Sequence, residues 1–139
     1  MSSEQIEAIN GNGFAAANLD GLGEGYGFRK IRKDLGVQEM GVNAIVLPPG
    51  VQTGTHWHDR QEEVYFVHQG TIEFTLGAND EDSVTLGPGG VIRVDAPTHR
   101  SLKNVGDDDA VYVIFGAQGG YVGRDGQHRE GEDRIVAGN

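Results

Sequence analysis

Short apolar stretches alternate with turn-forming residues through the middle of the chain. The first stretch, residues 42–47, is aliphatic and β-branched and ends at a Pro-Pro-Gly turn. Seven more stretches of strand length follow it, at residues 52–58, 62–68, 70–76, 83–86, 90–94, 99–104 and 110–115. Clusters of Gly, Asn and Asp separate them, and no helical period lies between them. This spacing predicts an antiparallel β-sandwich or a small β-barrel within residues 37–116.

An N-terminal extension, residues 1–36, precedes the strand pattern. It holds two glycine clusters and one candidate for a short helix, residues 28–35, whose apolar positions share a side and which Gly36 ends. We expect its basic residues to form a solvated helix face rather than a binding patch. These residues are Arg29, Lys30, Arg32 and Lys33.

Residues 117–139 follow the strand pattern and are rich in glycine and polar residues. Such a composition predicts a flexible C-terminal tail. The alternative is a flap across the mouth of the barrel, which would bring Tyr121 or His128 near a ligand.

Composition and charge narrow the classes of function. The chain of 139 residues has no cysteine, which excludes disulfides, thiolate metal sites and cysteine nucleophiles. Eleven Lys and Arg residues stand against 21 Asp and Glu residues, a formal net charge of −10. Because nucleic acids and anionic membranes bind basic surfaces, we expect neither as a partner. The N-terminus has no basic and apolar targeting pattern, so we expect a cytoplasmic protein.

Histidines are placed where a metal site could use them. His56 and His58 are two residues apart in a strand pattern, so both side chains project from the same face, about 7 Å apart at Cα. Glu63 follows after a connection short enough to bring the next strand alongside, and His99 begins a later strand. Imidazoles with a carboxylate suit Fe, Mn, Ni, Cu or Zn as divalent ions.

The spacing Gly50-x5-His56-x-His58-x4-Glu63-x6-Gly70 resembles the first signature motif of the cupin superfamily. Glu62 competes with Glu63 as the carboxylate. We prefer Glu63, because its distance to Gly70 fits the motif and Glu62 would alternate to the outer face.

The second cupin motif also has a counterpart in the chain. A glycine turn at residues 87–90 leads into an apolar strand and then to His99 and Asn104. The segment before His99 is one residue shorter than in the family. Four residues, instead of three, separate His99 from Asn104. The resemblance covers about residues 42–115.

The resemblance implies a small single-domain cupin, an all-β double-stranded β-helix with a jelly-roll-like barrel. It implies one divalent metal ion inside the barrel, held by His56, His58, Glu63 and His99. It also implies a homodimer, because small cupins often pair their sheets.

Strand parity extends these expectations. If His56 and His58 face inward, Trp57 faces outward, where it is more suited to a dimer contact than to substrate. Tyr65 and Val67 share the parity of Glu63 and should line the pocket, whereas His68 should lie at the surface. An alternating set is expected to form the apolar floor of the barrel, namely Ile72, Phe74 and Leu76.

The function favoured by these residues is a metalloenzyme of dioxygenase-like type that acts on a small organic substrate. Tyr65 or Arg93 could orient a substrate anion. The alternatives are a cupin isomerase or decarboxylase, a metal-anchored binding protein without turnover, and a purely structural barrel.

Overall fold

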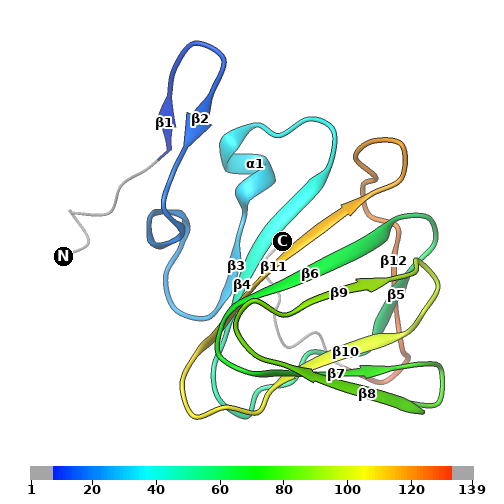
Figure 1. The fold of residues 1–139 in the computed structure, drawn as a ribbon. Coiled ribbons are helices and arrows are strands. Elements are labelled where there is room, and N and C mark those ends of the chain that lie inside the picture. Colours follow the sequence, from blue (N-terminus) through cyan, green and yellow to red (C-terminus); the bar gives the residue numbers. More distant parts are fainter. Residues whose placement is uncertain (1–7, 133–139) are drawn as a thin grey trace.

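The computed structural model describes residues 8–132 and consists of two five-stranded antiparallel sheets that face each other (Figure 1). In spatial order, the first sheet contains β3 (Gly27–Arg29), β4 (Gly41–Leu47), β11 (Ala110–Ala117), β6 (Glu62–Gln69) and β9 (Val91–Val94). The second contains β12 (Gly126–His128), β5 (His56–His58), β10 (Arg100–Asn104), β7 (Ile72–Leu76) and β8 (Asp82–Leu86). The all-β prediction is confirmed.

The terminal regions add a strand to each sheet. β3 pairs with β4, and β12 pairs with β5, so a segment from either end of the chain borders the barrel. Two further strands, β1 (Ile9–Asn10) and β2 (Ala15–Ala16), pair only with each other within the described chain. A 3₁₀ turn, Leu19–Leu22, follows this hairpin.

The short helix α1 (Ile31–Leu35) follows β3 and contacts β4. The expected helix over residues 28–35 is therefore confirmed in its second half, while its first residues pair as a strand with β4. Gly36 ends the helix at a φ of 72°, and its N–H donates to the carbonyl of Arg32. Neither helical segment within residues 8–132 has the length and apolar character to cross a membrane.

Side chains that alternate along the strands fill the space between the sheets. Tyr65 and Val67 of β6 and Ile72 and Phe74 of β7 are completely buried, as strand parity predicts. Phe74 meets the ring of Tyr65 edge-on, with 5.5 Å between centroids. Each such burial contributes about 1.5–3 kcal/mol, so this core holds the strands in one register.

Asn104, at the end of β10, links three parts of the chain. Its amide donates to the carbonyl oxygens of Leu47 and Asp108, and its side-chain oxygen accepts from the N–H of Gly106. Since Asn104 is fully buried, these bonds fix the end of β10 against β4 and against the turn that follows.

Candidate metal centre

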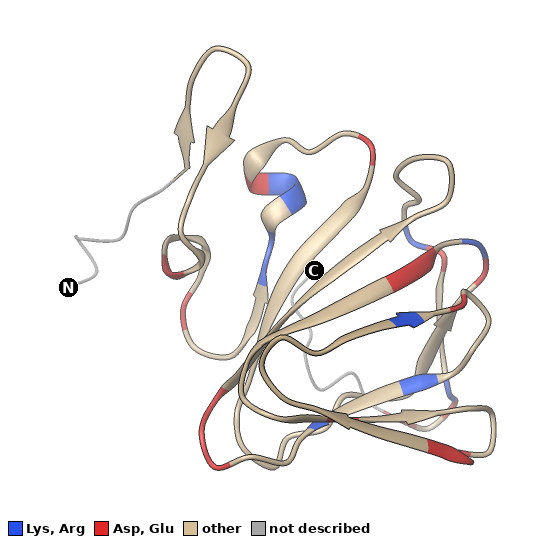
Figure 2. Ribbon diagram, in the orientation of Figure 1, with Lys and Arg blue, Asp and Glu red and all other residues tan. Residues whose placement is uncertain are grey.

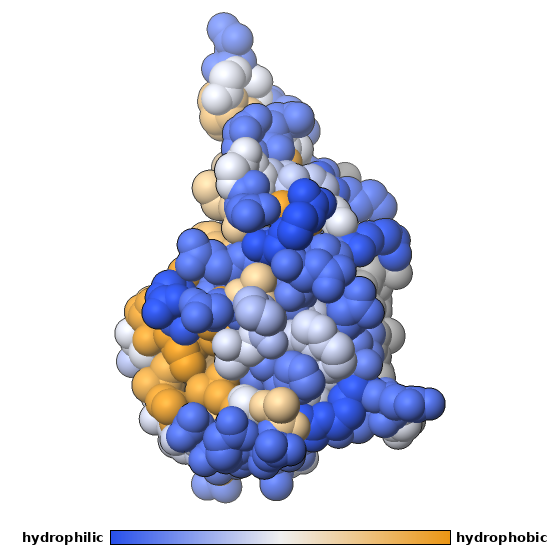
Figure 3. Space-filling model, turned by 90° about the vertical axis from the view of Figure 1, so that its right-hand side faces the viewer, coloured by the Kyte–Doolittle hydropathy of each residue, from blue (hydrophilic) through white to orange (hydrophobic). Residues whose placement is uncertain are grey.

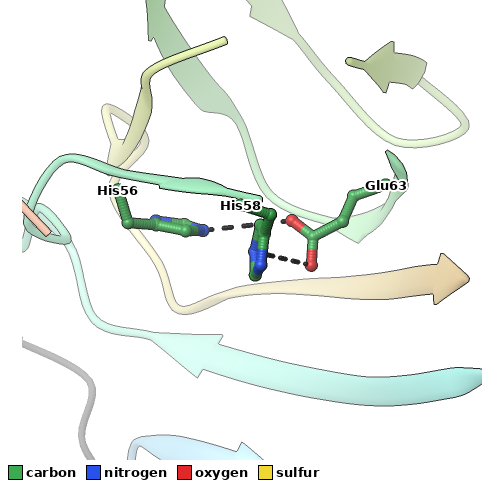
Figure 4. Close-up of side chains that lie close together, drawn as sticks. All are labelled: His56, His58 and Glu63. Carbon is green, nitrogen blue, oxygen red and sulfur yellow. Dashed lines mark ion pairs between the residues drawn. The ribbon is translucent and has the colours of Figure 1, made fainter. Parts of the chain in front are cut away.

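Two imidazoles and one carboxylate converge inside the barrel (Figure 4). His56 and His58 project from β5, and Glu63 projects from the start of β6. One ligand atom of each residue lies within 4.8 Å of the other two. His56 Nε2 is 3.9 Å from Glu63 Oε1, and His58 Nε2 is 3.3 Å from Glu63 Oε2. Glu63 is buried and Glu62 is exposed, in agreement with the preferred carboxylate.

Asp125 fixes the orientation of His58. His58 Nδ1 donates to Asp125 Oδ1 at 2.9 Å, and the same carboxylate accepts from the backbone N–H groups of Arg60 and Gln61 and from the side-chain amide of Gln61. Burial opposes the charge on Asp125, but these donors outweigh burial and lower its pKa well below the usual range. A histidine whose second nitrogen donates to a carboxylate is typical of metal ligands.

The other nitrogen of His58 is suited to a metal ion. Nε2 is buried and has no hydrogen-bond partner among the described residues. With Nδ1 as donor, a neutral ring presents the Nε2 lone pair to the Glu63 carboxylate, and two acceptors so close repel each other. A cation between them, either a proton or a metal ion, removes this repulsion. The residues present therefore fit a divalent transition metal.

The charge states of the three residues depend on one another. Burial lowers the pKa of His56 despite the nearby Glu63. Burial would also lower that of His58, but Glu63 and Asp125 together raise its pKa. Burial opposes ionisation of Glu63, yet the two imidazoles lower its pKa well below the usual range, so Glu63 is a carboxylate.

A hydrogen bond from Tyr65 holds the Glu63 carboxylate in place. The Tyr65 hydroxyl donates to Glu63 Oε1 at 2.7 Å. Complete burial, with the negative charge of Glu63 beside it, raises the pKa of Tyr65 well above its ordinary value, so the hydroxyl keeps its proton and remains a donor.

His99 lies outside this cluster. Its ring stacks on Trp57, with 3.9 Å between centroids and 9° between planes. Trp57 lies between His56 and His58 and has the opposite parity. The structure thus brings His56, His58 and Glu63 together, but it does not bring His99 to them.

Arg100 occupies the inward position beside the cluster instead. It is directly opposite His56 in the β10–β5 pair and is fully buried. Three residues separate Arg100 from Asn104, which is the spacing of the second cupin motif. Arg100 therefore stands where the motif has its histidine. Nη2 donates to the carbonyl of Asp95, while Nε and Nη1 are buried without a partner in the described part of the chain.

The two remaining predicted positions lie away from the site. Arg93 is 63% exposed and pairs with Asp95, so it is not the arginine near the cluster. His68 is exposed, as expected from its parity.

A cavity of about 620 Å³ opens above the cluster. The three candidate ligands and Tyr65 line it, together with apolar side chains of both sheets, among them Phe28, Ile45, Leu102 and Ile114. Residues from outside the central strands complete its walls, namely Lys30, Arg32, Lys33, Tyr121, Val122, Arg124, Asp125 and His128. Tyr121 and His128 thus line the cavity.

Two opposed sheets with imidazoles and a carboxylate between them define a β-barrel protein with a candidate transition-metal centre. The chain belongs to the cupin family, because the cupin domain profile matches residues 43–116. A search of curated proteins found no matching sequence.

Solved structures share this fold. An uncharacterised protein with a double-stranded β-helix domain from Klebsiella pneumoniae subsp. pneumoniae MGH 78578 is 18% identical, with a TM-score of 0.58 over 66% of this chain and 76% of that one. A putative sugar phosphate isomerase from Acidithiobacillus ferrooxidans is 24% identical, with a TM-score of 0.58 over 66% and 58% of the two chains. A predicted oxalate decarboxylase from Thermotoga maritima is 25% identical, with a TM-score of 0.51 over 55% and 64%. In the last two, the match covers less than two thirds of the other protein.

Sequence reasoning missed Asp125 and Arg100. Asp125 lies in a glycine-rich segment without periodicity, and no local signal places it beside His58. Arg100 did have a signal, because the three residues that the motif places between its histidine and its asparagine separate Asn104 from Arg100 rather than from His99.

Proposed function

We propose that this cupin is a metal-dependent enzyme of dioxygenase-like type that acts on a small organic substrate. His56, His58 and Glu63 would hold one divalent ion, with iron(II) as the ion for this chemistry. The observation that carries the proposal is the convergence of two imidazoles and one carboxylate within 4.8 Å, with a buried Nε2 on His58 that has no hydrogen-bond partner among the described residues.

The donor set supports the choice of reaction. Two histidines and one carboxylate on one face of an ion are the ligands of non-haem iron(II) oxygenases, and they leave coordination positions open. When bound, such an ion supplies a redox couple and open positions for O₂ and substrate. The loss of a fourth histidine to Arg100 brings the cluster closer to this three-ligand set.

The chain's own residues would prepare the site. Asp125 holds His58 in the tautomer with a free Nε2, and Tyr65 holds the Glu63 carboxylate. The apolar walls of the cavity would exclude water and receive the body of the substrate.

An isomerase or decarboxylase is the second candidate. The solved structures with the same fold include proteins described as a putative sugar phosphate isomerase and a predicted oxalate decarboxylase. Such a reaction would use the metal as a Lewis acid without consuming O₂.

The first experiment measures metal content and oxygen uptake. Purified protein loaded with iron(II) is expected to bind one ion per chain, and His58→Ala is expected to lose it. His68→Ala is the matched control, because His68 is exposed near the end of β6 and should leave metal content unchanged. Equal metal content in all three proteins would refute the ligand set. A bound metal without O₂ uptake on any tested substrate would favour the isomerase or decarboxylase alternative.

We also infer that the protein forms a homodimer through the outer face of the first sheet. Together with the charged Arg93, apolar side chains lie outward on three adjacent strands there, namely Val64, Phe66, Val91, Val113 and Phe115. Figure 3 shows an extended apolar area at the left side of that view. Trp57 is a weaker candidate for this contact, because its ring is already stacked on His99.

A further inference from the structure

The cavity concentrates positive charge in an acidic protein. Four of the 11 Lys and Arg residues line it, namely Lys30, Arg32, Lys33 and Arg124. Three of them lie on α1 or directly before it, where Figure 2 shows blue residues gathered. The segment was expected to be a solvated helix face, but the structure turns it to the mouth of the cavity.

The acidic side chains of the cavity offset only part of this charge. Glu63 and Asp125 are the two acids in its lining within the described residues. Glu63 is held by His56, His58 and Tyr65, and Asp125 accepts four hydrogen bonds from His58 and from residues 60–61. Two carboxylates against four Lys and Arg side chains leave the lining with an excess of two positive charges, the histidines being counted as neutral.

Arg100 adds a fixed positive charge near the cluster. Its guanidinium is completely buried, and two of its three nitrogens have no partner within residues 8–132. An unpaired buried cation is costly, and the anion near it is Glu63, whose pKa Arg100 helps to lower. A divalent ion held by Glu63 alone among the acids would increase this excess of positive charge.

Arg32 lines the cavity and forms no ion pair with the residues that the structure describes. Its guanidinium lies over the ring of Tyr121, with Cζ 4.1 Å from the ring centre. A guanidinium that lies over an aromatic ring still has N–H groups in its own plane. These groups can donate to a carboxylate or a phosphate.

We propose that the cavity binds a small organic acid, with its anionic group at the basic residues and its compact apolar body against the inner walls. Phe28, Ile45 and Ile114 supply apolar walls, and a volume of about 620 Å³ suits a molecule of this class. The proposal rests on the proposed function for the position of the cavity over the metal ligands. The basic residues indicate an acid as the substrate class, whereas the three candidate metal ligands indicate no substrate class.

Calorimetric titration with matched probes tests the proposal. Benzoate carries the charge, benzamide has nearly the same shape without it, and phenyl phosphate distinguishes a phosphate from a carboxylate as the preferred acid. The full chain is titrated at low ionic strength, both metal-free and loaded with zinc. We expect benzoate or phenyl phosphate to bind and benzamide to bind at least tenfold more weakly, with affinity falling as salt is added.

A pair of charge-matched variants locates the effect. Lys30→Gln/Lys33→Gln removes two charges at the cavity and is expected to weaken acid binding about tenfold. Arg93→Gln/Lys103→Gln removes two charges that lie outside the cavity lining and is expected to stay within twofold of the parent. Equal weakening in both variants, equal binding of benzamide, or no acid binding to the parent protein would overturn the proposal.

The metal measurement is independent of these outcomes. If iron and zinc fail to bind while the acids bind and the cavity variant weakens them, the proposed function fails and the acid site stands. If the metal binds and the acids do not, the proposed acid site fails and the metal site of the proposed function stands.

Discussion

The residue beside the histidine pair is Arg100, one position after the predicted ligand His99. The side chain at this position is therefore a cation and not an imidazole. His99 directly precedes β10 and Arg100 is its first residue, and the contacts of the two side chains differ. His99 stacks on Trp57, and the inward Arg100 lies opposite His56. The barrel therefore presents a cation where a fourth imidazole would otherwise complete the ligand set.

Replacing Arg100 by histidine should strengthen metal binding. Arg100→His removes a buried positive charge beside the site and offers a further imidazole, so we expect zinc affinity to rise about tenfold or more. Competition with a chromogenic chelator measures it. Arg100→Gln, which removes the charge without adding a ligand, should give a smaller gain.

The companion substitution tests the neighbouring histidine. His99→Ala should leave zinc affinity within twofold of the parent, because the ring stacks on Trp57 rather than facing Glu63. A tenfold loss in His99→Ala would instead place His99 among the ligands.

Asp125 should matter for metal binding although it is not one of the three ligands. Asp125→Asn removes the acceptor that keeps Nε2 of His58 free, so zinc affinity should fall about 10- to 100-fold. Asp59→Asn is the control. It makes the same change on an exposed side chain two residues from Trp57, and it should have no measurable effect. Equal affinities in the two variants would contradict the role of Asp125.

The sequence was sufficient for three members of the cluster and for their support. Strand parity predicts that His56 and His58 share one face of their strand, and that Glu63 and Tyr65 share the inward face of the next. Asp125 could not be predicted, because it is brought to His58 by a long return of the chain whose path depends on tertiary packing.

At the scale of elements, the turn between β6 and β7 has little freedom. Gly70 has a φ of 85°, and a Cβ built there would lie 2.8 Å from Cα of Ala110 at the start of β11. Gly50 has a similar φ of 79°, but a Cβ there would meet nothing within 4 Å. Substitutions at these two glycines therefore allow the effect of backbone strain to be measured with and without a steric clash.

Alanine at each position should give different losses of stability. Gly50→Ala is expected to lower the free energy of unfolding by about 1 kcal/mol, from the left-handed backbone alone. Gly70→Ala carries the same strain and also displaces β11, so we expect a loss of about 2–4 kcal/mol. Urea unfolding followed by circular dichroism measures both, and equal losses would exclude the contact with Ala110 as a cause.

The central strands were predictable because each is a short apolar or alternating stretch between turn signals. β3 and β12 were not, since each has three residues, includes a glycine and shows no alternation. Their pairing depends on the exposed edges of β4 and β5, which exist only after the barrel has formed.

At the scale of the whole molecule, the apolar face of the first sheet should control oligomeric state. Val91 and Phe115 are 59% and 39% exposed on that face. Val91→Lys/Phe115→Lys would place charges in the proposed contact, and we expect the dimer to dissociate into monomers. Light scattering coupled to size-exclusion chromatography measures the mass.

Ile9→Lys serves as the control, because Ile9 is 56% exposed in the separate β1–β2 hairpin. It should leave the dimer intact. A monomeric parent protein would refute the dimer, and a dimeric double variant would refute this face as its contact.

The cavity is lined both by the region that matches the cupin domain and by segments before and after that region. His56, His58 and Glu63 belong to the region that matches the cupin domain, residues 43–116, whereas the basic rim and Asp125 come from before and after it. Such an arrangement is modular. Exchange of the terminal segments with those of another cupin should therefore alter the cavity rim while leaving the barrel and its candidate metal centre in place.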